Sequence, residues 1–281
     1  MKKYIANMVG FLILSYFGLS CLAASPSSDL TGDSKITADG NSCPVGTVWV
    51  SINDPGASGH NEPFNGQMSK FETTNAQYCQ FLNAAEDSNQ ITVYNNYIYA
   101  SSDTSHFQPY YNLAGAGDTY NGATNGGAAR INYSGGSFTV DPNFDNHPVT
   151  YVSWYGATAF CNYYGYRLPK EWQWQAVANF DGSYLYGCGT IINNSIANYL
   201  GSTHPDGTTA VGALGTYGYG MADMTGNVSE WTSSASFYYG DSYRVIRGGS
   251  WFKSDDISTV SYWRDIRPNC MSYSIGFRVC R

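Results

Sequence analysis

The sequence predicts one loop-rich domain of short strands and few helices. Hydrophobic residues make up 43% of the 281-residue chain and aromatic residues 16%, which is enough apolar material for a sizeable core and excludes a disordered chain. Charged residues amount to only 12%, whereas glycine occurs 31 times. That mixture is typical of loops and short strands rather than of long solvated helices.

The first 24 residues have the pattern of a secretory signal peptide. Lys2 and Lys3 precede an uncharged apolar stretch over residues 8–22, and two alanines follow it. A permanent membrane anchor is the alternative, but the stretch is short and interrupted by glycine and serine. We therefore expect an exported protein, in the periplasm, on the cell surface or secreted, with no transmembrane anchor after cleavage.

Cys21 offers a second alternative, because it would be a lipidation site in a lipoprotein. A lipobox usually carries leucine three residues earlier, where this chain has Gly18. Residues 25–42 are small and polar, which is typical of a tether. We expect the folded domain to occupy residues 43–281.

Charge and cysteine content limit which ligands and metals we expect the protein to bind. A formal net charge of −7 makes nucleic acid an unsuitable partner. The sequence has no CxxC, and its four histidines have no ligand-like spacing, so we expect no zinc site. An even number of cysteines after cleavage predicts disulfides, although most pairings cannot be read from sequence. These cysteines are Cys43, Cys79, Cys161, Cys188, Cys270 and Cys280.

Hydrophobic periodicity predicts the order of elements. We expect a strand over residues 47–52, then a helix over 72–86 behind a threonine cap. A second helix is predicted from Ser153 to Gly165, and Pro169 is predicted to open a third. The stretch over 87–146 has no sustained period, so we expect long surface loops and short strands there.

Five blocks of sequence resemble one family in order and spacing. They are ETTNAQYCQFLNA, HPVTYVSWYGATAFCNYYGYRLPKEWQWQAVA, GYGMADMTGNVSEWTSS, RVIRGGSW and IGFRV. Over residues 43–281 the chain is similar to the formylglycine-generating enzymes, or sulfatase-modifying factors. The resemblance implies an α+β, C-type-lectin-like fold with little regular secondary structure.

The resemblance also implies structural calcium, a hard cation that takes oxygen ligands. In DMTGNVSEW the first site would use the carboxylates of Asp223 and Glu230 and the carbonyls of Gly226 and Val228. The alternative is that these carboxylates only cap turns. A second site, whose alignment needs a gap, would use Asn198, Tyr199, Asp206 and Thr208.

Catalysis is where the sequence departs from the family. Family enzymes oxidise a substrate cysteine with oxygen at a copper(I) ion held by two thiolates. At those two positions this chain has Lys253 and Ser258, and neither ammonium nor hydroxyl replaces a soft sulfur ligand. We therefore expect no copper and no formylglycine product. A related branch that uses iron needs an added helical domain, for which the chain has no room.

The same resemblance implies a disulfide between Cys161 and Cys280. The family partner follows GFR directly, whereas Val279 intervenes here. A shift of one residue reverses side-chain direction in a strand, which leaves the geometry of this pairing open.

Without the family chemistry, recognition of a protein or glycan ligand is the favoured function. The candidate ligand surface contains Phe252, Asp255, Tyr262 and Tyr273. A sharper alternative is a variable protein of a diversity-generating retroelement, which would place hypervariable residues between GGSW and IGFR. A third is an oxidoreductase of the family with an atypical site.

Overall fold

The computed structural model describes residues 43–56, 63–115, 119–120, 123–124, 128–200 and 207–281. The predicted signal peptide, the lipidation candidate Cys21, the tether and Asp206 lie outside these ranges. Within them, no helix is both long and apolar enough to span a bilayer.

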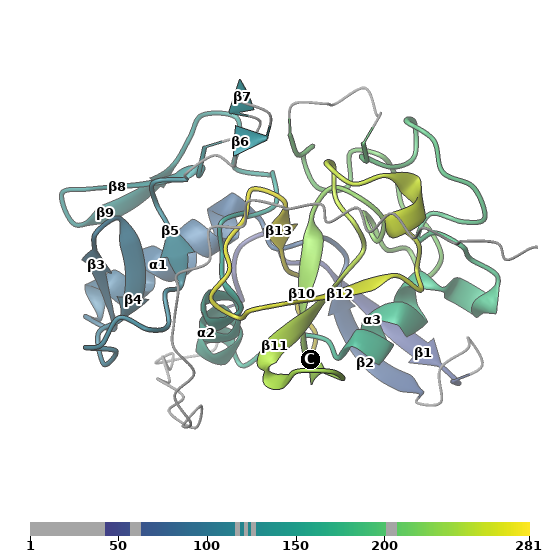
Figure 1. Ribbon diagram of the computed structural model, residues 1–281, viewed down its shortest axis with the longest axis horizontal. Coiled ribbons are helices and arrows are strands. Elements are labelled where there is room, and N and C mark those ends of the chain that lie inside the picture. The colour runs from purple at the N-terminus through teal and green to yellow at the C-terminus, as the bar shows by residue number, and fades with distance from the viewer. Residues whose placement is uncertain (1–42, 57–62, 116–118, 121–122, 125–127, 201–206) are drawn as a thin grey trace, which may run out of the picture.

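Short strands alternate with a few helices along the chain (Figure 1). The N-terminal elements are β1 (Trp49–Asp54), β2 (Phe64–Ser69), α1 (Asn75–Asp87), β3 (Ile91–Tyr94), β4 (Tyr97–Ala100), β5 (Tyr111–Asn112), β6 (Thr119–Tyr120), β7 (Ala123–Thr124), β8 (Ile131–Ser134) and β9 (Ser137–Val140). The C-terminal elements are α2 (Trp154–Tyr164), α3 (Glu171–Ala178), β10 (Ser229–Ser236), β11 (Gly240–Arg247), β12 (Trp263–Ile266) and β13 (Ile275–Gly276).

Helix α1 confirms the first predicted helix and its cap. The Thr74 side chain accepts a hydrogen bond from Gln77 N, and the Gln77 side chain accepts one from Thr74 N. This reciprocal pair satisfies two amide groups that a helix start leaves without partners. The apolar face, with Tyr78, Phe81 and Leu82, is fully buried. Packing of that face fixes the helix against the core.

Helices α2 and α3 begin and end near their predicted bounds. Ser153 caps α2, and Gly165 ends it in the left-handed conformation, which glycine adopts without steric cost. Helix α3 begins at Glu171, two residues after Pro169, because Lys170 takes the capping position. Trp174 on α3 is fully buried.

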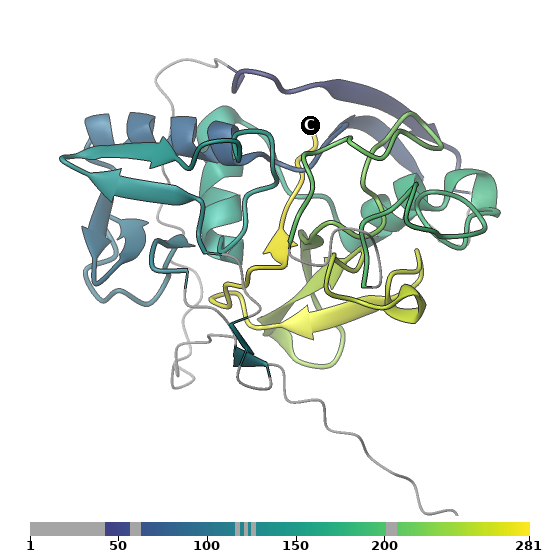
Figure 2. The same ribbon diagram turned by 90° about the horizontal axis from the view of Figure 1, so that it is seen from above.

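The central sheet has the strand order β12-β11-β10-β13. Strands β10 and β11 form an antiparallel hairpin with a register shift, and β13 lies parallel to β10. Beyond β13 the chain runs beside β2, where Gln67 and Arg281 exchange two backbone hydrogen bonds of 3.0 and 2.9 Å. The β1–β2 hairpin therefore closes over the C-terminal segment (Figure 2).

Residues 87–146 combine short strands with loops, as the sequence predicted. Strands β3, β4 and β5 form one sheet, and β8 and β9 form a separate hairpin. Asn95 and Asn96 have positive φ between β3 and β4, as do Gly135 and Gly136 between β8 and β9. These tight turns match strand twist, so both segments fold back as hairpins.

The core consists of two hydrophobic clusters. The first joins α1 and α2 to the central sheet and includes Trp231 and Phe277. The second lies beneath α3 and joins it to the β1–β2 hairpin through Trp174 and Met68. Together the two clusters hold in place the strands of the central sheet beside which the candidate site lies.

Candidate functional site

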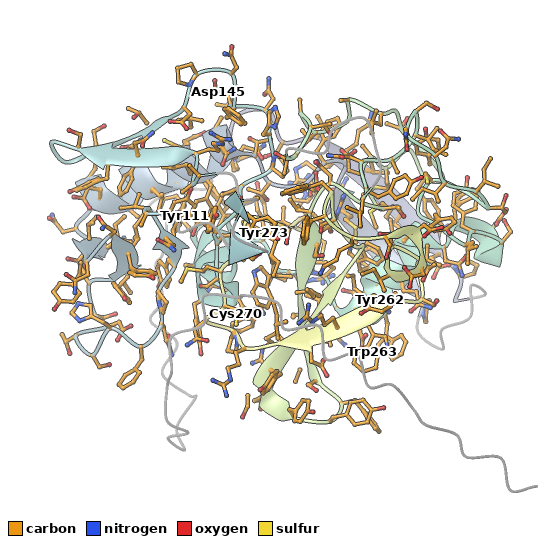
Figure 3. All side chains as sticks on the ribbon, turned by 45° about the horizontal axis from the view of Figure 1, so that its top comes forward. Tyr111, Asp145, Tyr262, Trp263, Cys270 and Tyr273 are labelled. Carbon is orange, nitrogen blue, oxygen red and sulfur yellow. The ribbon has the colours of Figure 1, made fainter. Side chains whose placement is uncertain are left out.

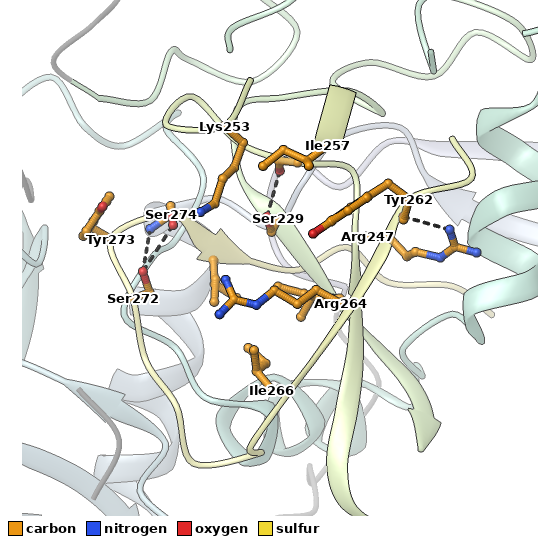
Figure 4. A pocket seen from close by; sticks show the side chains of 13 residues that line it. Ser229, Arg247, Lys253, Ile257, Tyr262, Arg264, Ile266, Ser272, Tyr273 and Ser274 are labelled. Atoms are coloured by element: carbon orange, nitrogen blue, oxygen red, sulfur yellow. Dashed lines mark hydrogen bonds between the residues drawn. The ribbon is translucent and has the colours of Figure 1, made fainter. Parts of the chain in front are cut away.

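A pocket of about 250 Å³ opens beside strands β11 and β12, against the segment that leads into β13 (Figure 4). Its described lining residues are Ser229, Ile246, Arg247, Gly249, Lys253, Ile257, Tyr262, Arg264, Ile266, Ser272, Tyr273, Ser274 and Ile275. No aspartate, glutamate or cysteine is among them. The lining therefore combines cationic, hydroxyl and aliphatic groups.

The register of β11 and β12 places Arg264 in this pocket. Ile246 pairs directly with Arg264, and paired residues on antiparallel strands share one face of the sheet. Ile266 follows two residues later, so it lies on the same face. Strand β12 is at the edge of this sheet, and its Arg264 side chain lines the pocket (Figure 4).

Lys253 enters the pocket from the turn after the GGSW motif. Its backbone N–H donates to Ser250 O at 2.8 Å, and its carbonyl accepts from Leu200 N at 2.8 Å. Burial, together with the nearby charge of Arg264, lowers the pKa of Lys253 to about 8. The side chains of Lys253 and Arg264 extend toward the same space beside Ser272 and Ser274 (Figure 4).

Serine hydroxyls form the opposite side of that space. The Ser272 and Ser274 hydroxyl oxygens lie 3.2 Å apart, and Ser274 N donates to Ser272 Oγ at 3.3 Å. Tyr151 N donates to the Ser272 carbonyl at 2.9 Å, which anchors this segment to the core. The two hydroxyls are thereby held on a fixed backbone.

Arg247 serves the structure of the site. Its Nη1 donates to the carbonyls of Val260 and Tyr262 at 3.1 and 2.9 Å, and its Nη2 donates to Gln175 Oε1 at 2.5 Å. Nη2 also lies 3.6 Å from Glu171 Oε2. Burial lowers its pKa to about 10, so the group remains charged. Arg247 thus ties the rim of the pocket to α3.

The two positions aligned with the family thiolates separate in space. Lys253 lines the pocket, whereas Ser258 is fully buried behind it and donates to Ser254 O at 2.9 Å. The remaining cysteine of this region, Cys270, lies in the first hydrophobic cluster and outside the pocket lining (Figure 3).

Only two of the four residues predicted for the ligand surface line the pocket. Tyr262 and Tyr273 line the pocket, whereas Phe252 packs against Tyr273 with ring centroids 5.6 Å apart. Asp255 is exposed and does not line the pocket. Ser272 and Ser274 lie in the window between GGSW and IGFR that the sequence offered as a variable surface. Arg264 was not among the predicted site residues, because its place in the pocket depends on strand register rather than on a motif.

The calcium candidates lie near a separate cluster of buried charges. Arg278 Nε and Nη2 donate to the two carboxylate oxygens of Glu230, each at 2.7 Å, and Trp174 Nε1 also donates to Oε2 at 2.7 Å. Glu72 accepts from Asn227 Nδ2 and Val228 N at 2.7 and 3.1 Å. Burial and the nearby carboxylates raise the pKa of Glu72 well above its usual value.

The remaining calcium candidates make the following contacts. Asp223 Oδ2 accepts from Gly212 N at 2.6 Å, and burial raises the pKa of Asp223 to about 6. Asn198, from the second predicted site, forms a parallel bridge with Gly226 from the first. The Asn198 side-chain amide donates to Gly207 O at 3.0 Å.

The other described residues of the second predicted site lie close by in the sequence. The Thr208 hydroxyl lies 2.9 Å from His147 Nδ1. Tyr199 is half-buried beside Asn198.

This donor set fits calcium in part. Asp223 and the carbonyls of Gly226 and Val228 are oxygen donors of the type that calcium prefers. Glu230 already has hydrogen-bond donors at both oxygens. Across the described ranges, no three His, Cys, Asp or Glu side chains converge in a way that could hold a metal ion. A calcium site here would therefore depend on backbone carbonyls.

The two cysteines of the expected disulfide lie close together in the core. Cys161 on α2 and Cys280 are both buried free thiols in this structure. Burial, followed by the influence of Cys280, raises the pKa of Cys161 well above its usual value. Arg167 and Cys280 form an isolated β-bridge that holds the C-terminal segment beside the end of α2.

Comparison with known sequences identifies one family, and the similarity to individual relatives covers about half of this chain. Residues 31–281 match the sequence profile of the sulfatase-modifying factor enzyme 1-like domain. The serine/threonine-protein kinase pkn1 of Chlamydia caviae is 32% identical over 171 residues, which are 54% of this chain and 27% of that protein. The inactive C-alpha-formylglycine-generating enzyme 2 of Mus musculus is 33% identical over 148 residues, 47% of this chain and 48% of that protein. The chain spans about half or less of these relatives.

Solved structures confirm the expected α+β, C-type-lectin-like fold. CarF has a TM-score of 0.57 and 20% identity over 83% of this chain and 92% of its own. Treponema denticola variable protein 1 has a TM-score of 0.50 and 20% identity over 83% of this chain and 91% of its own. At this identity the likeness concerns the fold alone.

Proposed function

The chain belongs to the sulfatase-modifying-factor family, and we propose that it is an exported, non-catalytic recognition protein within that family. The observation that carries this proposal is the lining of the pocket beside β11 and β12. It contains Lys253 and Arg264 and no cysteine. The export part rests on the signal-peptide pattern of the first 24 residues.

The chemistry of the lining argues against the copper reaction of the family. Copper(I) binds soft thiolate ligands, and the lining offers ammonium, guanidinium and hydroxyl groups instead. The two cations also repel a metal cation across a partly buried space, where charges interact more strongly than in water. The similarity to a mouse relative named inactive supports the same conclusion.

Copper(I) affinity tests this proposal directly. We expect the purified protein to take no copper(I) from a chromophoric chelator in a competition titration. The matched control is the Lys253→Cys, Ser258→Cys double variant, which restores both sulfur positions. Extraction of one equivalent of copper by the unmodified protein would contradict a non-catalytic site.

We also propose that calcium stabilises the fold. Of the first predicted set, Asp223 and the carbonyls of Gly226 and Val228 would bind the ion, while Glu230 would do so only by sharing oxygens that accept from Arg278. Asn198, Tyr199, Asp206 and Thr208 would supply the second set. The support is electrostatic: Glu72, Asp223 and Glu230 all interact with the single guanidinium of Arg278, although the three do not converge on one metal position among the described residues. A bound divalent cation would offset that surplus of negative charge.

A second candidate function is that of a variable binding protein. Its support is positional, because Lys253, Tyr262, Arg264 and Tyr273 all line the pocket and fall between GGSW and IGFR. The fold likeness to a Treponema denticola variable protein agrees with it at the level of architecture. A template repeat beside the gene, with substitutions confined to residues 252–274 across isolates, would support this candidate; uniform sequence there would exclude it.

A further inference from the structure

We infer that the pocket beside β11 and β12 binds a small organic anion, namely a carboxylate on a short apolar body. This inference rests on the proposal that the pocket serves recognition. The same chemistry occurs in a free organic acid and in the C-terminal carboxylate of a peptide whose last side chain is apolar. Both sources would present one negative charge next to a few carbon atoms.

Two cationic side chains share the pocket. Lys253 and Arg264 come from different elements and extend into one space (Figure 4). No acidic side chain is among the described lining residues. Burial, followed by the like charge of Arg264, lowers the pKa of Lys253, so the two cations repel each other in this partly buried space. An anion placed between the two cations would relieve the repulsion.

The pocket also offers hydrogen-bond donors that suit a carboxylate. A carboxylate has two acceptor oxygens, and it forms its strongest hydrogen bonds with cationic donors. Lys253 and Arg264 would supply such donors, and the hydroxyls of Ser272 and Ser274 lie beside them. Arg247 does not compete for this role, because both of its Nη atoms already donate within the protein.

The rest of the lining sets the size and polarity of the ligand. Four isoleucines, one each from β11, the 255–257 turn, β12 and β13, form an apolar wall together with two tyrosine rings; they are Ile246, Ile257, Ile266 and Ile275, with Tyr262 and Tyr273. A volume of about 250 Å³ lies below the roughly 300–1,000 Å³ of sites for drug-sized ligands. A bare inorganic anion would leave this wall uncovered, whereas an aryl or branched aliphatic acid would cover it.

Isothermal titration with matched probes tests the inference. Phenylacetate is compared with phenylacetamide, which has the same shape without the charge, and with sulfate, which has charge without an apolar body. Peptides ending in leucine, as free acid and as amide, test the second source. We expect at least about tenfold tighter binding of each acid than of its amide, and weak binding of sulfate.

Substitutions in the pocket lining test whether the acid binds in this pocket. Lys253→Met and Arg264→Met keep the apolar stems of the side chains but remove the charges, and each should weaken acid binding about tenfold. Arg267→Met is the matched control, because Arg267 is exposed, neighbours β12 and does not line the pocket. Circular dichroism and thermal melting establish that each variant is folded.

The wild-type comparison of acid and amide remains decisive if a variant fails to fold. Equal affinity for acid and amide, or no binding of any probe, would overturn the anion inference. It would leave the copper(I) result, and with it the non-catalytic proposal, unchanged. If the protein extracts copper(I) but still prefers the acids, the proposed function fails while the anion site stands. Stronger binding of the peptide acid would identify a peptide terminus as the source, and stronger binding of phenylacetate a free acid.

Discussion

Arg278 and Glu230 form a fully buried, two-point ion pair that ties the C-terminal segment to strand β10. Arg278 Nη1 and Nη2 also donate to the backbone carbonyls of Ser69, Lys70 and Ala222, with N···O distances of 3.0–3.3 Å. One side chain therefore joins the end of the chain, the β1–β2 hairpin and the loop before β10. We expect this contact to be central to the stability of the fold.

Replacing Arg278 by methionine tests that role. The variant leaves Glu230 buried beside Glu72 and Asp223 without its cation. Breaking a buried pair on one side typically costs about 3–5 kcal/mol of unfolding free energy. Urea denaturation followed by tryptophan fluorescence measures the loss. Asp241→Asn is the control, because the Arg244–Asp241 pair is largely exposed at Asp241 and should contribute little. Equal stability of both variants would contradict the assigned role.

Local signals in the sequence were sufficient for the helices. Thr74, Ser153 and Gly165 mark helix ends through short-range chemistry, so α1 and α2 agree with prediction. The Asn95-Asn96 and Gly135-Gly136 turns were equally local signals, but the stretch around them was predicted only as loops with short strands, without assigned hairpins. Parallel pairing of β13 with β10 brings together residues about 46 positions apart, and no local pattern encodes such pairing.

The candidate site was predicted only where a motif marks it. Lys253, Tyr262 and Tyr273 follow from the window between GGSW and IGFR. Ser272, Ser274 and Arg264 lie in the same window, but the place of Arg264 in the pocket required knowledge of the β11–β12 register, because a shift of one residue would turn its side chain away. The ion pair between Glu230 and Arg278 likewise joins two residues that are 48 positions apart in the sequence.

Chelation tests the calcium proposal. A ligand that binds only the folded state raises stability by about 2.7 kcal/mol at a concentration one hundred times its Kd. We therefore expect EDTA to lower the Tm by about 5 °C or more and added calcium to restore it. Asp223→Asn should abolish most of this shift. An identical Tm with EDTA and with calcium, together with no bound metal by elemental analysis, would reject calcium.

Oxidation state tests the proposed Cys161–Cys280 disulfide. Burial raises the pKa of Cys280 to about 11, so both thiols should react slowly with alkylating reagents in the native reduced protein. In protein exported to an oxidising compartment we expect the bond to form and to add about 4 kcal/mol in the chain-entropy model. Non-reducing peptide mapping checks the pairing, and recovery of both cysteines as alkylated thiols after denaturation would refute it.

Acid binding in the pocket should depend on pH through Lys253. Its pKa of about 8 means that the ammonium is present at pH 7 and mostly lost at pH 9. Affinity for phenylacetate should therefore fall about tenfold over that range. Arg247, with a pKa of about 10, remains largely charged there, and Arg264, Tyr262 and Tyr273 are the other ionisable groups in the described lining. Lys253→Met should show a flat profile; a wild-type profile that is equally flat would exclude Lys253 as the charged partner.

The most direct test of the central claim is the family reaction itself. A cysteine-containing CxPxR peptide is incubated with the purified protein, copper(I), reductant and oxygen, and the products are analysed by mass spectrometry. We predict only unmodified or disulfide-linked peptide, because Lys253 and Ser258 occupy the thiolate positions. An aldehyde product that depends on the protein, and that is lost in the Cys270→Ala variant, would show that the site is catalytic.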